Sequence, residues 1–264
     1  LSILAELREK DFLPTGGRNL HYKLLARKVR TSTRKNGYLY GSRPGSSTLL
    51  SKLLTDARSA GLIDPDDIDD GTRPVFRVQP DGTIGNYVNG NLDGLFANYF
   101  SDVHADQLHH VELLVEKNTI APLIWKHVGQ TFRLTVTSLR GYGSFPAARD
   151  VASRFKASGK DKLIAIYVSD LDPEGIDMPA SWKKYLLHDF GIAATVYRAA
   201  VTPEQVQRFN LPPDADVKLS STRAAKFIQQ HGDQCWELDS MPEQVLIDEV
   251  SKAVRAVLDI DALN

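Results

Sequence analysis

Acidic residues stand at the ends of two apolar segments in the second half of the chain. The segment HHVELLVE ends in Glu116, and the segment KLIAIYVSD leads to Asp170 and Asp172. Groups at the carboxyl ends of parallel strands meet at one crevice of an open α/β sheet, and residues i and i+2 of an extended segment share a side. Carboxylate oxygens without His or Cys favour a hard divalent cation, so these three residues predict a Mg²⁺ site.

The same residues have a simpler interpretation, in which Glu116 is a surface acid and DLDPEG is a solvated turn. The ligand pattern of a calcium-binding EF-hand is not present around Asp170. The order of the motifs, each at a strand end, favours the metal site. Lys117, next to Glu116, is a second-tier candidate for contact with a phosphate. Glu174 could add a ligand or interact favourably with the N-terminus of the following helix.

Strands that alternate with helical patterns predict an α/β domain with a mostly parallel sheet. Apolar segments bounded by turn residues predict strands at 111–116, 133–137, 163–169, 194–197 and 235–238. Further helices are expected from about residue 92 to 106 and from 242 to 258. A glycine-containing loop, SLRGYGSFPAARD, follows the second strand.

The first 80 residues read as helices followed by a small β element. Leu20, Leu24 and Leu25 give the segment RNLHYKLLARK one apolar face. A second helix is expected from Ser46 or Ser47 to Ala60, and LIDPDDIDDGTRPVFRV has two short apolar segments that predict a hairpin. This order is typical of a winged helix-turn-helix. The turn-rich segment 79–91 is the expected boundary, which gives a winged-helix domain at 1–88 and an α/β domain at 89–264.

Basic residues are concentrated at the N-terminal end. Residues 1–60 hold 12 Lys and Arg against 4 Asp and Glu, and residues 61–264 hold 20 against 29. Eight basic residues and no acid lie between Arg18 and Arg43, counting both. The asymmetry indicates a module that binds a polyanion, attached to an acidic one. A solvated basic face is the alternative.

The composition excludes several other classes of protein. The 264 residues are 42% hydrophobic and 25% charged, as in globular proteins. No run approaches the roughly 18 apolar residues that a membrane span requires, and LSILAELREK lacks the apolar core of a signal peptide. Cys235 is the single cysteine, which excludes a disulfide scaffold and fits a reducing compartment. We therefore expect a cytoplasmic protein.

Motifs along nearly the whole chain resemble those of one family. Glu116, the glycine-containing loop and the Asp170-x-Asp172 pair follow the signature of the Toprim domain. TGGRNLHYKLL resembles the Arg-Asp-[Ile/Leu]-Tyr-Tyr segment of the topoisomerase VI A subunit and of its meiotic double-strand-break relative. VTPEQVQRFNLPPDADVK and CWELDSMPEQVL are similar to that family's C-terminal segments. The chain is shorter than a full A subunit and resembles a compact "mini-A" form.

The resemblance implies a type IIB topoisomerase A-like transesterase that makes double-strand breaks through a 5′-phosphotyrosyl link. Its nucleophile corresponds to Tyr22, which Arg18, four residues earlier, could assist by supplying charge or by gripping the scissile phosphate. The metal ligands correspond to Glu116, Asp170 and Asp172. The candidate DNA-binding residues, taken from the basic run and the glycine-containing loop, are Arg27, Lys28, Arg30, Arg34 and Arg140.

Two residues depart from the family's pattern. The usual Asp after the Arg is Asn19 here, and the first Tyr of the pair is His21. Asn19 removes a carboxylate that could orient Arg18, which puts the efficiency of cleavage in doubt. His21 could accept a proton or bind phosphate, although a His beside an aromatic residue on a helix is more often a packing or surface residue.

The expected partners follow from the resemblance. They are double-stranded DNA, a second copy of the chain in a homodimer, and a separate GHKL-type ATPase resembling the B subunit, because this chain has no P-loop. In the family, the Tyr of one protomer works with the metal site of the other. The setting implied is the nucleoid of a prokaryote, a virus or a plasmid.

Two alternatives stay open at this point. One is a Toprim nuclease that cuts DNA with metal-activated water, in which Tyr22 only packs or binds. The other is a duplex-binding protein that does not cleave. Attachment of protein to DNA 5′ ends separates the transesterase from both, and metal-dependent free cuts separate the nuclease from the binding protein.

Overall fold

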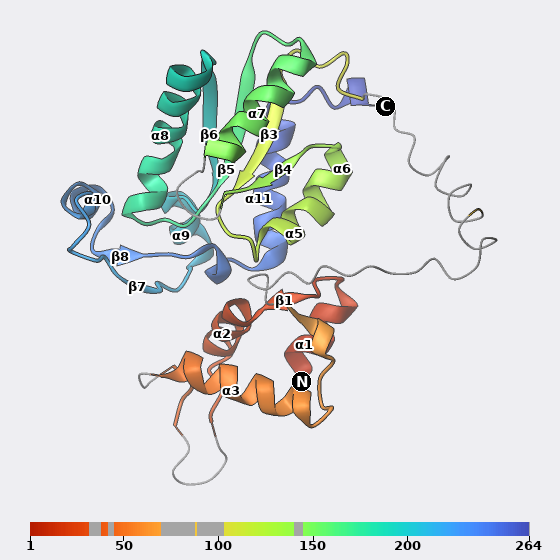
Figure 1. The fold of residues 1–264 in the computed structure, drawn as a ribbon. Helices are drawn as coiled ribbons and strands as arrows, with labels where there is room; N and C mark the ends of the chain where they lie inside the picture. The colour runs from red at the N-terminus through yellow and green to blue at the C-terminus, as the bar shows by residue number, and fades with distance from the viewer. Residues whose placement is uncertain (32–37, 42–44, 70–87, 89–102, 140–144, 264) are drawn as a thin grey trace.

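The computed structural model describes residues 1–31, 38–41, 45–69, 88, 103–139 and 145–263 (Figure 1). The N-terminal part consists of helices and a short parallel strand pair: α1 (Ser2–Glu9), β1 (Thr15–Gly16), α2 (Gly17–Ala26), α3 (Ser46–Ser59), the 3-10 helix η1 (Pro65–Asp67) and β2 (Ile68–Asp69). Leu20 and Leu50 are buried in its core, as the apolar faces of α2 and α3 require.

The C-terminal part alternates strands and helices. Its elements are β3 (His110–Val115), α5 (Ala121–Ile124), the π-helix η2 (Trp125–Gly129), α6 (Gln130–Phe132), β4 (Val136–Ser138), α7 (Phe145–Ser158), β5 (Leu163–Val168), α8 (Pro173–Phe190), β6 (Ala194–Ala200), α9 (Pro203–Phe209), β7 (Ala215–Asp216), α10 (Ala224–His231), β8 (Gln234–Cys235), the 3-10 helix η3 (Leu238–Ser240), α11 (Glu243–Arg255) and the 3-10 helix η4 (Asp261–Leu263).

The central sheet is parallel, with the strand order β4-β3-β5-β6. The strand β4, which follows β3 in sequence, pairs with one edge of β3, and β5 pairs with the other edge. In open α/β sheets, ligands bind at the carboxyl ends of the strands, next to the point where the strand order reverses. The topology therefore places the switch between the ends of β3 and β5.

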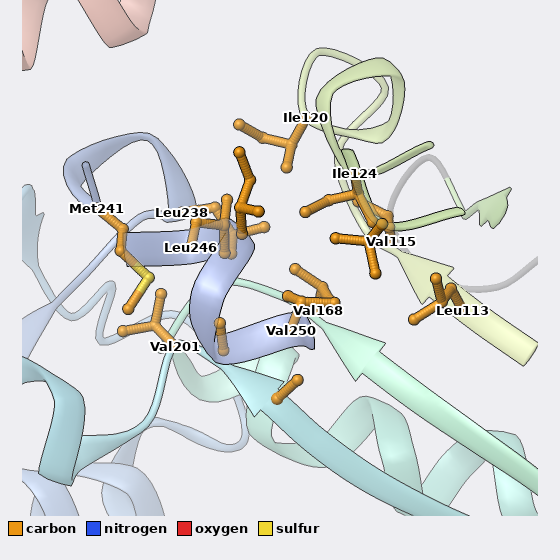
Figure 2. Close-up of a cluster of buried hydrophobic side chains, with 14 of the residues drawn as sticks. Leu113, Val115, Ile120, Ile124, Val168, Val201, Leu238, Met241, Leu246 and Val250 are labelled. Atoms are coloured by element: carbon orange, nitrogen blue, oxygen red, sulfur yellow. The ribbon is translucent and has the colours of Figure 1, made fainter. Parts of the chain in front are cut away.

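Helices cover both faces of the sheet (Figure 1). On β5, Leu163, Ala165 and Tyr167 belong to the core under α7 and α8, as alternation along a strand requires. The alternate residues Ile164, Ile166 and Val168 belong to the opposite core. There Val168 lies near Val250 of α11 (Figure 2). Because both faces are covered, every residue of β5 is buried.

Several sequence predictions can be compared with this fold. The α/β class with a mostly parallel sheet is confirmed, and four of the predicted strands correspond to β3, β4, β5 and β6. The strand predicted at 235–238 is wrong as a member of that sheet. Only Gln234–Cys235 forms a strand, in an antiparallel pair with β7, and Leu238 begins η3.

Other predictions fall partly outside the described residues. The hairpin expected within 62–78 is described only as far as Asp69, and Ile68–Asp69 pairs in parallel with β1. The boundary segment 79–91 and the helix expected at 92–106 lie mostly outside as well. The winged-helix and Toprim assignments therefore stay predictions. Within the described part of the chain, no helix is both long and apolar enough to cross a membrane.

Candidate active site

The carboxylates at the ends of β3 and β5 lie next to each other. The two strands pair along their whole length, from His110 opposite Leu163 to Val115 opposite Val168. The backbone N–H of Asp170 donates a hydrogen bond of 3.2 Å to Oε2 of Glu116. The strand pairing thus brings Glu116 to the turn that carries Asp170, as the sequence predicts.

The turn after β5 is fixed by hydrogen bonds. Asp172 is the N-cap of α8, and its Oδ1 accepts a 2.6 Å hydrogen bond from the N–H of Gly175. Arg198 of β6 donates to the carbonyl oxygens of Asp170 (2.9 Å), Val201 (3.0 Å) and Gly175. Arg198 is therefore a positioning residue for the loop that presents the two aspartates.

The Gly175→Ala change should disturb this turn. A Cβ at position 175 would lie 2.3 Å from the carbonyl oxygen of Asp170, a backbone atom that cannot move alone. We expect a loss of about 1–3 kcal/mol in the free energy of unfolding, the usual cost of overpacking, measured by urea denaturation. Gly17→Ala is the matched control, because its Cβ would meet only Leu54 at 3.9 Å. Equal stability of both variants would contradict the clash.

Lys117 lies among three carboxylates. Its Nζ is 3.1 Å from Oδ2 of Asp170, 3.1 Å from Oε2 of Glu237 and 2.8 Å from Oδ2 of Asp239. Burial alone would lower the pKa of Lys117, but these carboxylates raise it above its ordinary value. The ammonium group is therefore charged and neutralises part of the acidic cluster. The phosphate contact expected of Lys117 would have to displace these partners.

The residues fit a Mg²⁺ ion held by Glu116 and Asp172. Both line a cavity of about 440 Å³, whereas Asp170 is engaged through Oδ1 by the N–H of Leu238 and through Oδ2 by Lys117. Burial and the charges of Asp170 and Asp172 raise the pKa of Glu116 to about 7, so a cation beside it would be favourable. Mg²⁺ commonly uses one or two carboxylates together with water and phosphate oxygens.

The full predicted ligand set of Glu116, Asp170 and Asp172 is not arranged around one metal position in the described part of the chain. Among the described residues, no group of three or more His, Cys, Asp or Glu side chains is arranged to hold a metal ion. Glu174 accepts a 2.7 Å hydrogen bond from the hydroxyl of Ser221. The ligand roles of Glu116, Asp170 and Asp172 accordingly stay predictions.

Tyr22 and Arg18 face the acidic cluster from α2. The hydroxyl of Tyr22 donates a short hydrogen bond to Oδ1 of Asp214. Nε of Arg18 lies 2.7 Å from Oε2 of Glu237, and its Nη2 lies 3.6 Å from Oδ2 of Asp214. Burial, and then the hydrogen bond to Asp214, raise the pKa of Tyr22 above its ordinary value. The phenol is therefore protonated at neutral pH.

One cavity lies between Arg18 and the aspartates that follow β5. It measures about 360 Å³, and Arg18 of α2 and the aspartates Asp170 and Asp172 all line it. Asp214, Lys218 and Glu237 line it as well. Arg18, which is expected to bind a phosphate, and two of the three expected metal ligands thus border the same space within a single chain. The arrangement across two protomers stays a prediction.

The two residues that depart from the family's pattern differ in their surroundings. Asn19 is buried, and its Oδ1 accepts no hydrogen bond from the residues described. His21 Nδ1 lies 2.6 Å from the hydroxyl of Tyr40, and the two rings pack edge to face. This contact supports the packing interpretation of His21. Burial lowers the pKa of His21, so the ring is neutral at pH 7.

The candidate DNA-binding residues are only partly described. Arg27, Lys28 and Arg30 are exposed at and beyond the C-terminal end of α2. Arg27 forms an ion pair with Glu6, so part of its charge is already neutralised. Arg34 and Arg140 lie outside the described residues.

Sequence reasoning missed four residues of this site. Asp214, Glu237 and Asp239 lie within the segments that resemble the family's C-terminal motifs, where no pattern assigns them a role, and no pattern points to Arg198. The one available signal was the spacing of Glu237 and Asp239, which repeats the i, i+2 pattern of Asp170 and Asp172 after a short extended segment.

Comparison with known proteins adds no assignment. No protein-family model matches the chain, and no curated protein matches it.

Proposed function

We propose that the protein is a DNA-cleaving transesterase of the topoisomerase VI A type. The observation that carries the proposal is the cavity that Arg18 shares with Asp170 and Asp172, with the hydroxyl of Tyr22 bonded to Asp214 at the same cavity. A tyrosine, a guanidinium and oxygen ligands are the groups that phosphotyrosyl transfer requires. The parallel sheet with its switch point between β3 and β5 is compatible with a Toprim domain.

Each residue has a role in this chemistry. Tyr22 attacks the phosphorus and conserves the bond energy in a phosphotyrosyl link, so the strand can be resealed without a cofactor. Arg18 binds the non-bridging oxygens of the phosphate. Glu116 and Asp172, with Asp170 as the further predicted ligand, would hold Mg²⁺, which would supply stabilisation of the negative charge that develops during phosphoryl transfer.

The proposal includes the partners implied by the resemblance. A homodimer would place one site on each strand of a duplex, as two-fold symmetry requires. Strand passage would use a separate GHKL-type ATPase subunit. We place the protein with DNA in the cytoplasm of a prokaryote, or in association with a virus or plasmid.

The decisive experiment asks whether protein becomes attached to DNA. Supercoiled plasmid is incubated with the protein and Mg²⁺, quenched with detergent, and analysed before and after protease treatment. We expect linear DNA that enters the gel only after protease. Protein-free cuts that need Mg²⁺ would instead support the nuclease alternative, and intact plasmid would support the binding protein.

Neutralising the N-terminal basic residues should weaken DNA binding. Replacing Arg27, Lys28, Arg30 and Arg34 together by Gln should lower affinity for all sequences. It should also reduce the slope of log K against log salt by up to about 3.6, since each of the four phosphate contacts contributes roughly 0.9. Fluorescence anisotropy at several salt concentrations measures both. The matched control replaces four exposed lysines of the C-terminal part by Gln. These are Lys156, Lys183, Lys184 and Lys226. Equal slopes for the two variants would assign the basic run to a solvated face.

A further inference from the structure

We propose that Asp214 accepts the phenolic proton of Tyr22 of the same chain when Tyr22 attacks DNA. The inference rests on the proposed function and adds a catalytic residue to it. Asp214 touches the reacting atom itself, because its Oδ1 receives the hydrogen bond from the Tyr22 hydroxyl. No role in proton transfer follows from the sequence motifs, which place Asp214 only in the segment LPPDADVK.

The position of Asp214 is built by the fold. It immediately precedes β7, and its N–H donates a 2.9 Å hydrogen bond to the carbonyl oxygen of Cys235 in β8. The β7–β8 pair therefore holds the carboxylate where α2 presents Tyr22, which is itself only 4% exposed. A general base must lie within hydrogen-bond reach of the proton that it takes, and this pair meets that requirement.

Neighbouring groups are committed elsewhere. Glu237 binds Arg18 and Lys117, and Nδ1 of His21 faces the hydroxyl of Tyr40. Among the described residues, Asp214 is thus the one whose carboxylate is bonded to the phenol. A base is needed because burial disfavours the free phenolate, so the proton must leave as the new bond forms.

The step balances in atoms and charge. The Tyr22 oxygen forms a bond to phosphorus as the bond from phosphorus to the 3′ oxygen breaks, which leaves a 5′-phosphotyrosyl link. The phenolic proton passes to Asp214 and then to solvent, and the 3′ oxygen takes a proton from solvent. Resealing reverses the order, with the protonated Asp214 returning a proton to the departing phenolate.

The Asp214→Asn variant tests the proposal. An Asn can still accept the hydrogen bond from Tyr22 through Oδ1, so the geometry is kept, but it cannot take a proton. We expect single-turnover formation of the covalent complex to slow by about 100-fold or more, the usual contribution of a general base. The matched control is Asp233→Asn, which removes the same charge from an exposed position before β8. Unchanged thermal unfolding and DNA binding of Asp214→Asn would show that folding is intact.

Chemical rescue separates proton transfer from a structural role. In Asp214→Ala the space of the carboxylate is open, and added formate can take its place as the base. We expect formate to accelerate covalent-complex formation well above chloride at equal ionic strength. The comparison with chloride is needed because salt itself weakens DNA binding.

The outcomes distinguish this inference from the proposed function. A wild-type protein that never becomes attached to DNA overturns both. A cleaving wild type with an Asp214→Asn variant that is equally fast or faster overturns only the role of Asp214, and a faster variant would identify Asp214 as a restraint on Tyr22. A slow Asp214→Asn variant whose Ala counterpart shows no rescue by formate also overturns it, because the residue would then act through structure alone.

Discussion

Replacing Tyr22 by Phe is expected to abolish the covalent attachment of protein to DNA while leaving the fold and DNA binding intact. The change deletes the one oxygen that would bond to phosphorus, so no phosphotyrosyl link can form at this position. One hydrogen bond to the Asp214 carboxylate is lost, which costs about 1.5–3 kcal/mol of the free energy of unfolding, and the protein should still fold. Asp214 keeps Arg18 at 3.6 Å as a partner. The measurements are plasmid cleavage with and without protease, urea unfolding, and anisotropy with labelled duplex.

Tyr197→Phe provides the matched control. Tyr197 lies on β6 and is 48% exposed, and nothing assigns it to the site. The Tyr197→Phe variant should cleave DNA at the wild-type rate. Free cuts by Tyr22→Phe at the wild-type rate would instead point to the nuclease, with Tyr22 serving only to pack against Asp214.

The central part of the fold could be predicted because its signals are local. The strands β3 and β5 are covered on both faces, so their residues are almost continuously apolar and their boundaries are clear. Their parallel pairing then brings the residues that follow them to one edge. This is why Glu116 could be placed beside Asp170 from the sequence.

The rest of the site could not be predicted because it depends on long-range contacts. Asp214 and Glu237 reach the cavity through the short antiparallel pair of β7 and β8, whose two-residue strands carry no periodic pattern. The segment Cys235–Leu238 resembled a fifth strand of the sheet because Cys235, Trp236 and Leu238 are apolar. In the structure, Trp236 forms an isolated bridge with Leu171, and the N–H of Leu238 binds Asp170.

The contact between α2 and the α/β part could not be predicted either, and it bears on how the site is assembled. Lys23 Nζ lies 2.6 Å from Oε2 of Glu243, and Arg18 Nε lies 2.7 Å from Oε2 of Glu237. Together with the bond from Tyr22 to Asp214, these ion pairs hold α2 against its own chain. The resemblance implies a tyrosine that serves the partner's carboxylates. Within one chain, Arg18 and the aspartates already border one cavity, and the arrangement across two protomers stays a prediction.

Mixed dimers should distinguish the two arrangements. One protomer carries Tyr22→Phe, and the other carries Glu116→Gln. The Gln can still accept the hydrogen bond from the N–H of Asp170 but loses the charge that would hold Mg²⁺. Glu116 is preferable to Asp170 here, because Asp170 also binds Lys117 and the N–H of Leu238, and its loss would disturb the fold. Two different affinity tags allow the mixed dimer to be purified.

For a site completed within one chain, each protomer of the mixed dimer lacks one essential group. We therefore expect nicking no faster than in either parent variant, under conditions in which the wild type cleaves. For a site shared between protomers, the intact Tyr22 of one chain would meet the intact Glu116 of the other. One of the two sites would then be complete, and the mixed dimer would nick a single strand with the protein attached. Such nicking would overturn the same-chain arrangement and, with it, the assignment of Asp214 to the Tyr22 of its own chain. A protein that is monomeric both alone and on DNA would also exclude the shared site, because no second protomer would be available to complete it.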